Sequence, residues 1–306
     1  MRYALTLSYD GIGFCGWQIQ PSEPSVQAAL QQALTTLLGC ETAVTGAGRT
    51  DTDVHALQYV AHFDYEGPLP NESKDFLYKL NAILPSGVAV FSISEVADDF
   101  HARFDACRRT YLYFIHFRKD PFVERYSWHC KFPLDVEKMN EACRYLLGTR
   151  DFSCFEKKGA DSKTAICTIS EARWEGYQPT LWEMSCGGGT GCGHVAEPSA
   201  GSGPAAKPSA APHLAGAASL NATTSPRAGA GLGLGPGSEP GSYLVFRISA
   251  DRFLRNMVRA IVGTMVEVGR GRLSPEDIPA ILDSKDRCRA GQSVPGNALF
   301  LASVEY

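Results

Sequence analysis

The sequence contains no long apolar run. Its 306 residues include no stretch of about 18 consecutive apolar residues, the length that a helix needs to cross a bilayer. The first residues, Met1–Ala4, lead directly into an alternating apolar and polar pattern, with no targeting segment. We therefore exclude a membrane protein and expect a soluble, unexported, cytoplasmic protein that binds no membrane.

Paired cysteines are also missing. The ten cysteines are scattered singly from Cys15 to Cys288, with no Cys-x-x-Cys pair. Disulfide scaffolds and zinc modules usually rely on closely spaced cysteines, and no secretion signal points to an oxidising compartment. We expect most of these cysteines to be reduced thiols in or near the core.

Neither sign of charge dominates. The formal net charge is −4, which argues against a protein that coats nucleic acid indiscriminately. One stretch, from His101 to Lys119, is nevertheless basic: Arg103, Arg108, Arg109, Arg118 and Lys119 stand against Asp105 alone. The positive charge that could contact phosphate is therefore concentrated in this stretch, whereas the protein as a whole is acidic.

Aromatic residues are absent from residues 187–242, where Gly, Ala, Pro and Ser predominate. Such a segment buries too little apolar surface to offset an ordering entropy of about 1–2 kcal/mol per residue. We predict a disordered insertion between two hairpin strands, Leu181–Ser185 and Tyr243–Ala250. Lengthening a surface loop costs only about 0.6 kcal/mol per doubling, so the fold should survive deletion of the insertion.

Apolar periodicity divides the remaining chain into two α+β halves. Alternation marks strands, and apolar residues at helical spacing after a capping residue such as Ser25 mark helices. The first half is predicted to contain a strand at Tyr3–Tyr9, a helix after Ser25, a strand at Gln58–Phe63, a helix at Ser73–Leu84 and a strand at Val88–Val96. The second half is predicted to contain a strand at Arg109–Phe117, a helix from Asp135 to Gly148, strands at Thr164–Tyr177 and Tyr243–Ala250, a helix at Asp251–Val268 and a strand at Leu299–Glu305.

These elements favour an α+β fold of two similar lobes that share a central sheet, each lobe a mixed or antiparallel sheet with helices on one side. The N-terminal lobe spans residues 1–105. The C-terminal lobe spans residues 106–306 and is interrupted by the insertion at 187–242.

The stretch Gly48–Ala56, with the sequence Gly-Arg-Thr-Asp-Thr-Asp-Val-His-Ala, carries the strongest chemical signal. It places Asp51 in a short polar turn, two residues after Arg49. The motif resembles the catalytic loop of the TruA family of tRNA pseudouridine synthases, in which the aspartate at the position of Asp51 is the nucleophile. Further motifs follow in the family's order and approximate spacing: Tyr9-Asp10-Gly11, Phe14–Gln18, Ser25-Val26-Gln27, Phe100–Phe104, Arg109–Tyr113, Asp151–Phe155, Lys163-Thr164 and Phe253–Arg259.

The resemblance implies the pseudouridine synthase fold, with an active-site cleft between the lobes and Asp51 in that cleft. Uridine becomes pseudouridine when the bond from ribose C1′ to uracil N1 breaks and C1′ rejoins the base at C5. This reaction is an isomerisation, so we expect no redox cofactor and no metal. A carboxylate with a reference pKa of about 3.9 is ionised at pH 7 and can attack C1′ or remove a ribose proton.

The family also implies roles for other residues. Arg49 helps take the target base out of its stack, Arg259 pairs with the nucleophile, and Tyr111 stacks on the target uracil. A bidentate pair would fix the direction of the Asp51 carboxylate. Strand periodicity by itself does not choose between Tyr111 and Tyr113, because both project to one face.

Basic residues near these positions are expected to meet the RNA. Arg109, Lys157 and Lys158 are the predicted substrate-binding residues, although a solvated cluster of charges explains the two lysines equally well. On the predicted helix Asp251–Val268, the arginines would share one face: Arg252, Arg255 and Arg259. The resemblance further implies a homodimer that binds the anticodon arm of tRNA and modifies uridines 38 to 40.

Other readings remain open. A metal-dependent phosphohydrolase would use Asp51 and Asp53 as ligands, and a catalytically impaired protein of the same fold would bind tRNA without turnover. A glycosidase is disfavoured because it ordinarily needs a second carboxylate about 5–10 Å away. Asp53 stands where the family has glycine, which predicts a positive φ at this position and an added negative charge beside Asp51.

Overall fold

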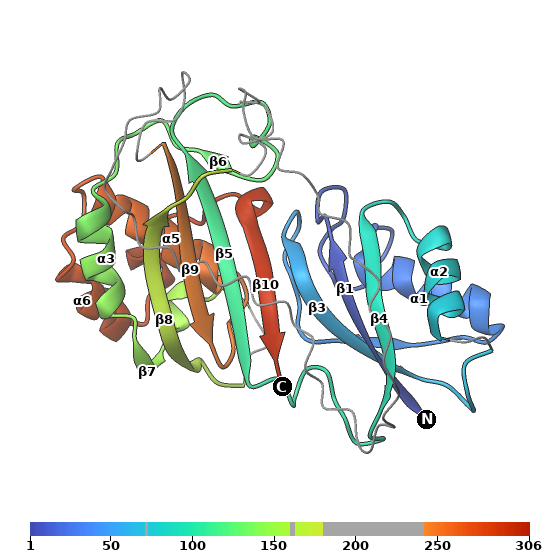
Figure 1. Ribbon diagram of the computed structural model, residues 1–306. Coiled ribbons are helices and arrows are strands. Elements are labelled where there is room, and N and C mark those ends of the chain that lie inside the picture. Colours follow the sequence, from blue (N-terminus) through green and yellow to red (C-terminus); the bar gives the residue numbers. More distant parts are fainter. Residues whose placement is uncertain (71–72, 160–162, 180–241) are drawn as a thin grey trace, which may run out of the picture.

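One mixed sheet of ten strands runs through the part of the chain that the structure describes. The computed structural model describes residues 1–70, 73–159, 163–179 and 242–306. The strand order is β4-β1-β3-β10-β5-β9-β8-β7, with β2 paired to β3 and β6 to β5 (Figure 1). The strands are β1 (Arg2–Tyr9), β2 (Val44–Gly46), β3 (His55–Asp64), β4 (Val88–Val96), β5 (Arg108–His116), β6 (Trp128–His129), β7 (Gly148–Asp151), β8 (Ile166–Gly176), β9 (Tyr243–Ala250) and β10 (Leu299–Glu305).

The N-terminal half combines β1 to β4 with α1 (Val26–Leu38) and α2 (Ser73–Ile83). Ser25 caps α1 as predicted, because its Oγ accepts the N–H of Ala28 at 3.3 Å. Gly39 ends α1 in the left-handed conformation, with a φ of 70°. The core between these strands and helices includes Leu5, Leu7, Leu30, Leu34, Tyr59 and Phe63.

The C-terminal half carries α3 (Val136–Arg144), α5 (Met257–Gly269) and α6 (Asp277–Ser284). Asp135 caps α3 as predicted by accepting the N–H of Lys138 at 3.1 Å. In Figure 1 these three helices gather at one end of the sheet, and α1 and α2 lie at the other end. Short 3₁₀ turns complete this half: η1 (Ser153–Phe155), η2 (Arg287–Arg289) and η3 (Gly296–Ala298). The predicted α+β class is confirmed.

Strand β10 joins the two halves. It pairs in parallel with β3, where Phe300 lies opposite His55, and antiparallel with β5, where Leu301 lies opposite Tyr111 (Figure 1). The last strand of the chain is therefore the centre of the sheet. This register brings the loop that precedes β3 close to the middle of β5.

The helix predicted at Asp251–Val268 begins later than expected. The observed helix α5 starts at Met257, and Asn256 before it is left-handed, with a φ of 65°. Residue 251 continues the pairing with β8, since its N–H donates to the Thr168 carbonyl and its carboxylate accepts the Thr168 N–H at 2.8 Å. The prediction of one helical face of arginines is therefore wrong for the two that precede α5, Arg252 and Arg255.

The predicted hairpin partner of Tyr243–Ala250 is also wrong. Strand β9 lies between β5 and β8, so both of its edges are occupied. The segment that returns beside it is β8, whose Gly176 lies opposite Leu244. The predicted strand at Leu181–Ser185 lies outside the described residues, as does nearly all of the insertion predicted at 187–242.

The state of the cysteines and the lengths of the helices can be compared with the expectations from composition in the part of the chain that the structure describes. Every cysteine among them is a free thiol, and four are buried: Cys130, Cys143, Cys154 and Cys167. Burial raises the pKa of the Cys143 thiol to about 12, as expected for an inert core residue. Among the helices of the described segments, none is long and apolar enough to cross a membrane.

Candidate active site

The Asp51 loop connects β2 to β3 and is anchored on both sides of the carboxylate. The buried hydroxyls of Thr50 and Tyr9 are hydrogen-bonded at 2.9 Å, and the Thr50 carbonyl accepts the N–H of Trp17 at 3.3 Å. On the other side, the Val54 N–H donates to the Asp51 carbonyl at 3.2 Å. The backbone is therefore fixed while the Asp51 side chain stays about a quarter exposed, at 25%.

Three glycines allow the rest of the protein to approach this loop closely. A Cβ on Gly11 would collide with the Val54 carbonyl, one on Gly16 with the Thr50 carbonyl, and one on Gly296 with the Thr52 carbonyl. Gly11 and Gly16 lie in the connection between β1 and α1, and Gly296 lies in η3. Close approach of backbone to backbone is a recurrent reason for glycine, and here it defines the position of Asp51.

Arg259 on α5 faces Asp51, as the resemblance implies. Its Nη1 lies 3.5 Å from Asp51 Oδ2, and both side chains are partly exposed. The contact is single and not bidentate, because Arg259 Nε donates to the Val294 carbonyl at 2.7 Å. Arg259 is therefore itself held in place, and the outer face of the Asp51 carboxylate remains open.

Tyr111 lies beside this pair on β5. Its ring packs edge-on against Phe253 at 5.1 Å between centroids, and it remains partly exposed. Burial raises the pKa of Tyr111 to about 12, and the Asp51 carboxylate adds to the rise. Tyr113, the alternative left by periodicity, is fully buried and donates its hydroxyl to the Pro295 carbonyl at 3.1 Å. Of the two, only Tyr111 is partly exposed to solvent.

Arg49 and Arg109 have different environments. Arg49 is exposed, and no described residue pairs with its guanidinium. Arg109 donates from Nη1 and Nη2 to four carbonyls, those of Arg103, Ala106, Ala47 and Asp251, at 2.7 to 3.0 Å. The terminal nitrogens of Arg109 therefore hold the start of the Asp51 loop against β5 and the β4–β5 connection, and its part in substrate binding stays a prediction.

Lys157 and Lys158 lie near the start of α5. The Lys157 N–H donates to the Arg255 carbonyl at 3.0 Å, and Lys158 Nζ lies 3.4 Å from the Cys288 thiol. Both side chains are exposed. No described contact connects them to Asp51, so their role in binding RNA stays a prediction.

His55 organises the loop from its far end. Its Nδ1 accepts the N–H of Gly11 at 3.0 Å, its Nε2 bonds to the Asn297 carbonyl at 3.1 Å, and its ring stacks on Phe300. Burial lowers the pKa of His55. A neutral ring with both nitrogens occupied fits the organising role better than proton transfer.

Residues 294–297 support the site, although no motif or periodicity in the sequence predicts this role. The carbonyls of Val294, Pro295 and Asn297 hold Arg259, Tyr113 and His55, respectively. Gly296 in the same segment contacts the backbone of the Asp51 loop. A stretch without periodicity or reactive side chains thus links the loop to α5 through its main chain.

Asp53 adopts the positive φ expected of the family's glycine, at 63°. Replacing Asp53 with glycine would relieve a conformation that side chains rarely adopt and remove a charge worth about 1 kcal/mol at 4 Å in water. We expect Asp53→Gly to raise the turnover rate about fivefold, measured with saturating tRNA.

The variant Asp53→Asn removes the charge and keeps a side chain at the same φ. If Asp53→Asn has a rate between those of the unmodified protein and Asp53→Gly, removal of the charge and relief of the positive φ each contribute to the gain. Equal or lower activity of Asp53→Gly would contradict the prediction.

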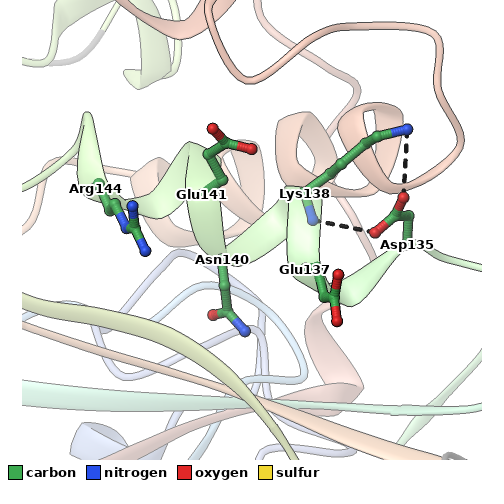
Figure 2. A pocket seen from close by; sticks show the side chains of 6 residues that line it. All are labelled: Asp135, Glu137, Lys138, Asn140, Glu141 and Arg144. Atoms are coloured by element: carbon green, nitrogen blue, oxygen red, sulfur yellow. Dashed lines mark hydrogen bonds and ion pairs between the residues drawn. The ribbon is translucent and has the colours of Figure 1, made fainter.

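Two surface hollows have linings that do not include Asp51. One of about 650 Å³ is lined by side chains of α3 and its cap, which Figure 2 shows as a row of solvated charges. In this row Lys138 pairs with Asp135 at 3.3 Å. Asn140 bonds to the backbone of Trp174 on β8 through both amide atoms. These contacts explain the side chains by their part in the structure, so this surface needs no functional role.

One cluster could hold a metal ion within the described segments. His116, Glu124 and His129 place their ligand atoms within 4.8 Å of one another, at the opposite end of β5 from Arg108. His116 already uses both ring nitrogens, one for Ser127 and one for Glu124. Asp51 and Asp53 belong to no such group in the described residues, and the expected absence of a metal from the reaction stays a prediction.

Comparisons with known proteins agree on one class, the pseudouridine synthases. A profile of the family described as tRNA pseudouridine synthase matches residues 142–306. The chain is 41% identical over 305 residues to tRNA pseudouridine synthase A of Bacteroides fragilis, covering 100% of this chain and 96% of the relative. It is 34% identical over 311 residues to tRNA pseudouridine synthase A of Bacillus velezensis, covering 100% and 99%.

The chain therefore belongs to the tRNA pseudouridine synthase family and is an isomerase. The family that was predicted from motifs such as Gly48–Ala56 and Phe253–Arg259 is therefore confirmed.

Proposed function

We propose that this protein converts uridines 38 to 40 in the anticodon arm of tRNA to pseudouridine, with Asp51 as the nucleophile. The observation that carries the proposal is the accessible Asp51 carboxylate, held 3.5 Å from Arg259 and beside Tyr111. The relatives named tRNA pseudouridine synthase A support tRNA as the substrate.

The target uridine leaves its stack and lies against the exposed face of Tyr111, with Arg49 occupying the space it vacates. Base extrusion costs a few kcal/mol, and stacking on an aromatic ring returns about 1–3 kcal/mol. Tyr111 stays neutral because its pKa is raised to about 12, so its hydroxyl adds no charge beside Asp51 at pH 7.

Asp51 then acts on the ribose. Its carboxylate attacks C1′ or removes a ribose proton as the bond to N1 breaks, and the base turns and rejoins C1′ through C5. As C1′ bonds to C5, the bond from Asp51 to C1′ breaks or, in the other route, the ribose proton returns. C5 then releases its proton to solvent and N1 takes one up, so the nucleoside has the same atoms before and after. Arg259 holds the carboxylate through Nη1 while Val294 holds Arg259, which keeps the nucleophile oriented during both steps.

The larger setting is part of the same proposal. The protein acts in the cytoplasm as a homodimer, with the N-terminal lobe at residues 1–105, the C-terminal lobe at 106–306 and the RNA in a cleft between the lobes. The family assignment supports this arrangement, and the meeting of β3, β10 and β5 at the Asp51 loop is compatible with it. Neither rival, the phosphohydrolase or the impaired binding protein, is favoured by an observation.

Tritium release tests the proposal, because C5 of uracil loses its hydrogen only when the new glycosidic bond forms there. The protein is incubated with C5-tritiated tRNA transcripts that keep uridine at 38, 39 or 40 or replace all three by cytidine. We expect release from the first set, none from the last, and no change on adding a chelator. Binding without release would support the impaired protein, and loss of activity with chelator would reopen the metal-dependent reading.

A further inference from the structure

Phe104 is an aromatic side chain that the fold leaves uncovered. It lies between β4 and β5 and is 73% exposed. Trp17 is 2% exposed and stacks on Tyr59 in the core. Phe104, by contrast, is largely exposed to solvent and contacts only the neighbouring side chains of its own turn among the ring contacts of the described residues.

The turn that presents Phe104 is rigid. The His101 N–H donates to the Asp105 carboxylate at 2.7 Å, and His101 Nδ1 accepts the N–H groups of Arg103 and Phe104 at 3.1 and 3.3 Å. The hydroxyl of Tyr306 donates to the Ala102 carbonyl at 2.6 Å. Hydrogen bonds thus fix the backbone that carries the exposed ring, which lowers the ordering cost of binding a ligand there.

Cationic and aromatic groups flank the ring. The Arg103 guanidinium carbon lies 5.6 Å from the Phe104 ring centroid, and the His101 ring lies 4.2 Å away. An exposed ring next to an arginine is the combination that single-stranded RNA meets in stacking platforms, where the base lies on the ring and the cation faces phosphate.

The turn borders the site through Arg109. Arg109 Nη2 donates to the Arg103 carbonyl at 2.7 Å and to the Ala47 carbonyl, at the start of the Asp51 loop, at 3.0 Å. Arg109 and Tyr111 project from the same face of β5, about 7 Å apart along the strand. An RNA that places its uridine on Tyr111 therefore passes within a few nucleotides of Phe104.

We propose that Phe104, with Arg103 beside it, is a stacking platform for an unpaired nucleotide of the RNA that flanks the uridine being isomerised. The inference rests on the proposed function. The platform binds by ring stacking and phosphate contact, so it accepts any base. Such tolerance suits an enzyme that serves several neighbouring uridines in different sequence contexts.

The test compares Phe104→Ala, Phe104→Leu and Phe104→Tyr with the unmodified protein. We measure the dissociation constant for tRNA with each protein, and tritium release in single turnover at saturating enzyme. Phe104→Ala and Phe104→Leu should weaken tRNA binding roughly tenfold, with the saturated rate within about twofold of the unmodified protein. Phe104→Tyr should restore binding, because it restores the ring.

Phe122→Ala is the matched control. Phe122 is 71% exposed, lies in the turn after Asp120 and has no described contact with the Asp51 loop or with the turn that carries Phe104, so its removal should leave binding unchanged. Unchanged binding by Phe104→Ala, or full binding by Phe104→Leu, would overturn the platform. Failure of the proposed function is distinguishable, because the unmodified protein itself would then release no tritium.

Discussion

Replacing Asp51 with asparagine should abolish pseudouridine formation while leaving tRNA binding intact. Asparagine has nearly the same shape but cannot act as a carboxylate nucleophile or base. Removal of a nucleophile in other enzymes costs roughly 10⁴-fold or more in turnover, which corresponds to about 5 kcal/mol in the barrier. Single-turnover tritium release from C5-labelled tRNA, measured at saturating enzyme, gives this loss directly.

The control for Asp51→Asn is Asp53→Asn, which makes the same change two residues further along the loop. Asp51 lies 3.5 Å from Arg259, and the charge of Asp51 raises the pKa of Tyr111. Asp53 has neither of these described interactions. Turnover should therefore survive in the control and disappear in the test variant. Substantial release by Asp51→Asn, or equal losses in both variants, would assign the chemistry to another group.

Replacing Gly16 with alanine should remove most of the activity without touching a reactive group. Gly16 has a φ of 87°, and a Cβ there would collide with the Thr50 carbonyl and press on the Asp51 backbone. The loop must shift, and a shift of about 1 Å can cost 10²-fold in rate. We expect turnover to fall about a hundredfold, measured by the same tritium assay, and thermal stability to fall as well.

Gly13→Ala separates backbone strain from the collision. Gly13 has a nearly identical φ of 89°, but a Cβ there meets nothing within 4 Å. Both variants place a side chain in the left-handed region at a cost of about 1–2 kcal/mol, so their melting temperatures should both drop. Only Gly16→Ala should lose turnover among the molecules that stay folded. Equal activity of the two folded variants would show that the close approach at Gly16 does not position Asp51.

Local signals predicted most of the elements because they depend on neighbouring residues. Alternation located β4 and β9 at their observed bounds, and a serine and an aspartate in N-cap position marked the starts of α1 and α3. The start of α5 was missed because Asp251 bonds to Thr168 on β8 and Asn256 is left-handed, and helical periodicity registers neither feature.

The sequence by itself determined the family and the α+β class and pointed to Asp51 as the predicted nucleophile, since each depends on short motifs or on the spacing of apolar residues. Only the tertiary structure decided which groups meet Asp51. Arg259 is 208 residues away from it, and the Asn297 carbonyl is 242 residues away from His55.

The structure also decided between residues that look equivalent in sequence. It left Tyr111 accessible and buried Tyr113, and it committed Arg109 to four backbone carbonyls while leaving Arg49 exposed. The physical reason is the insertion of β10 between β3 and β5. Strand register across a sheet fixes such neighbours, and no local pattern in the chain encodes which strands will lie side by side.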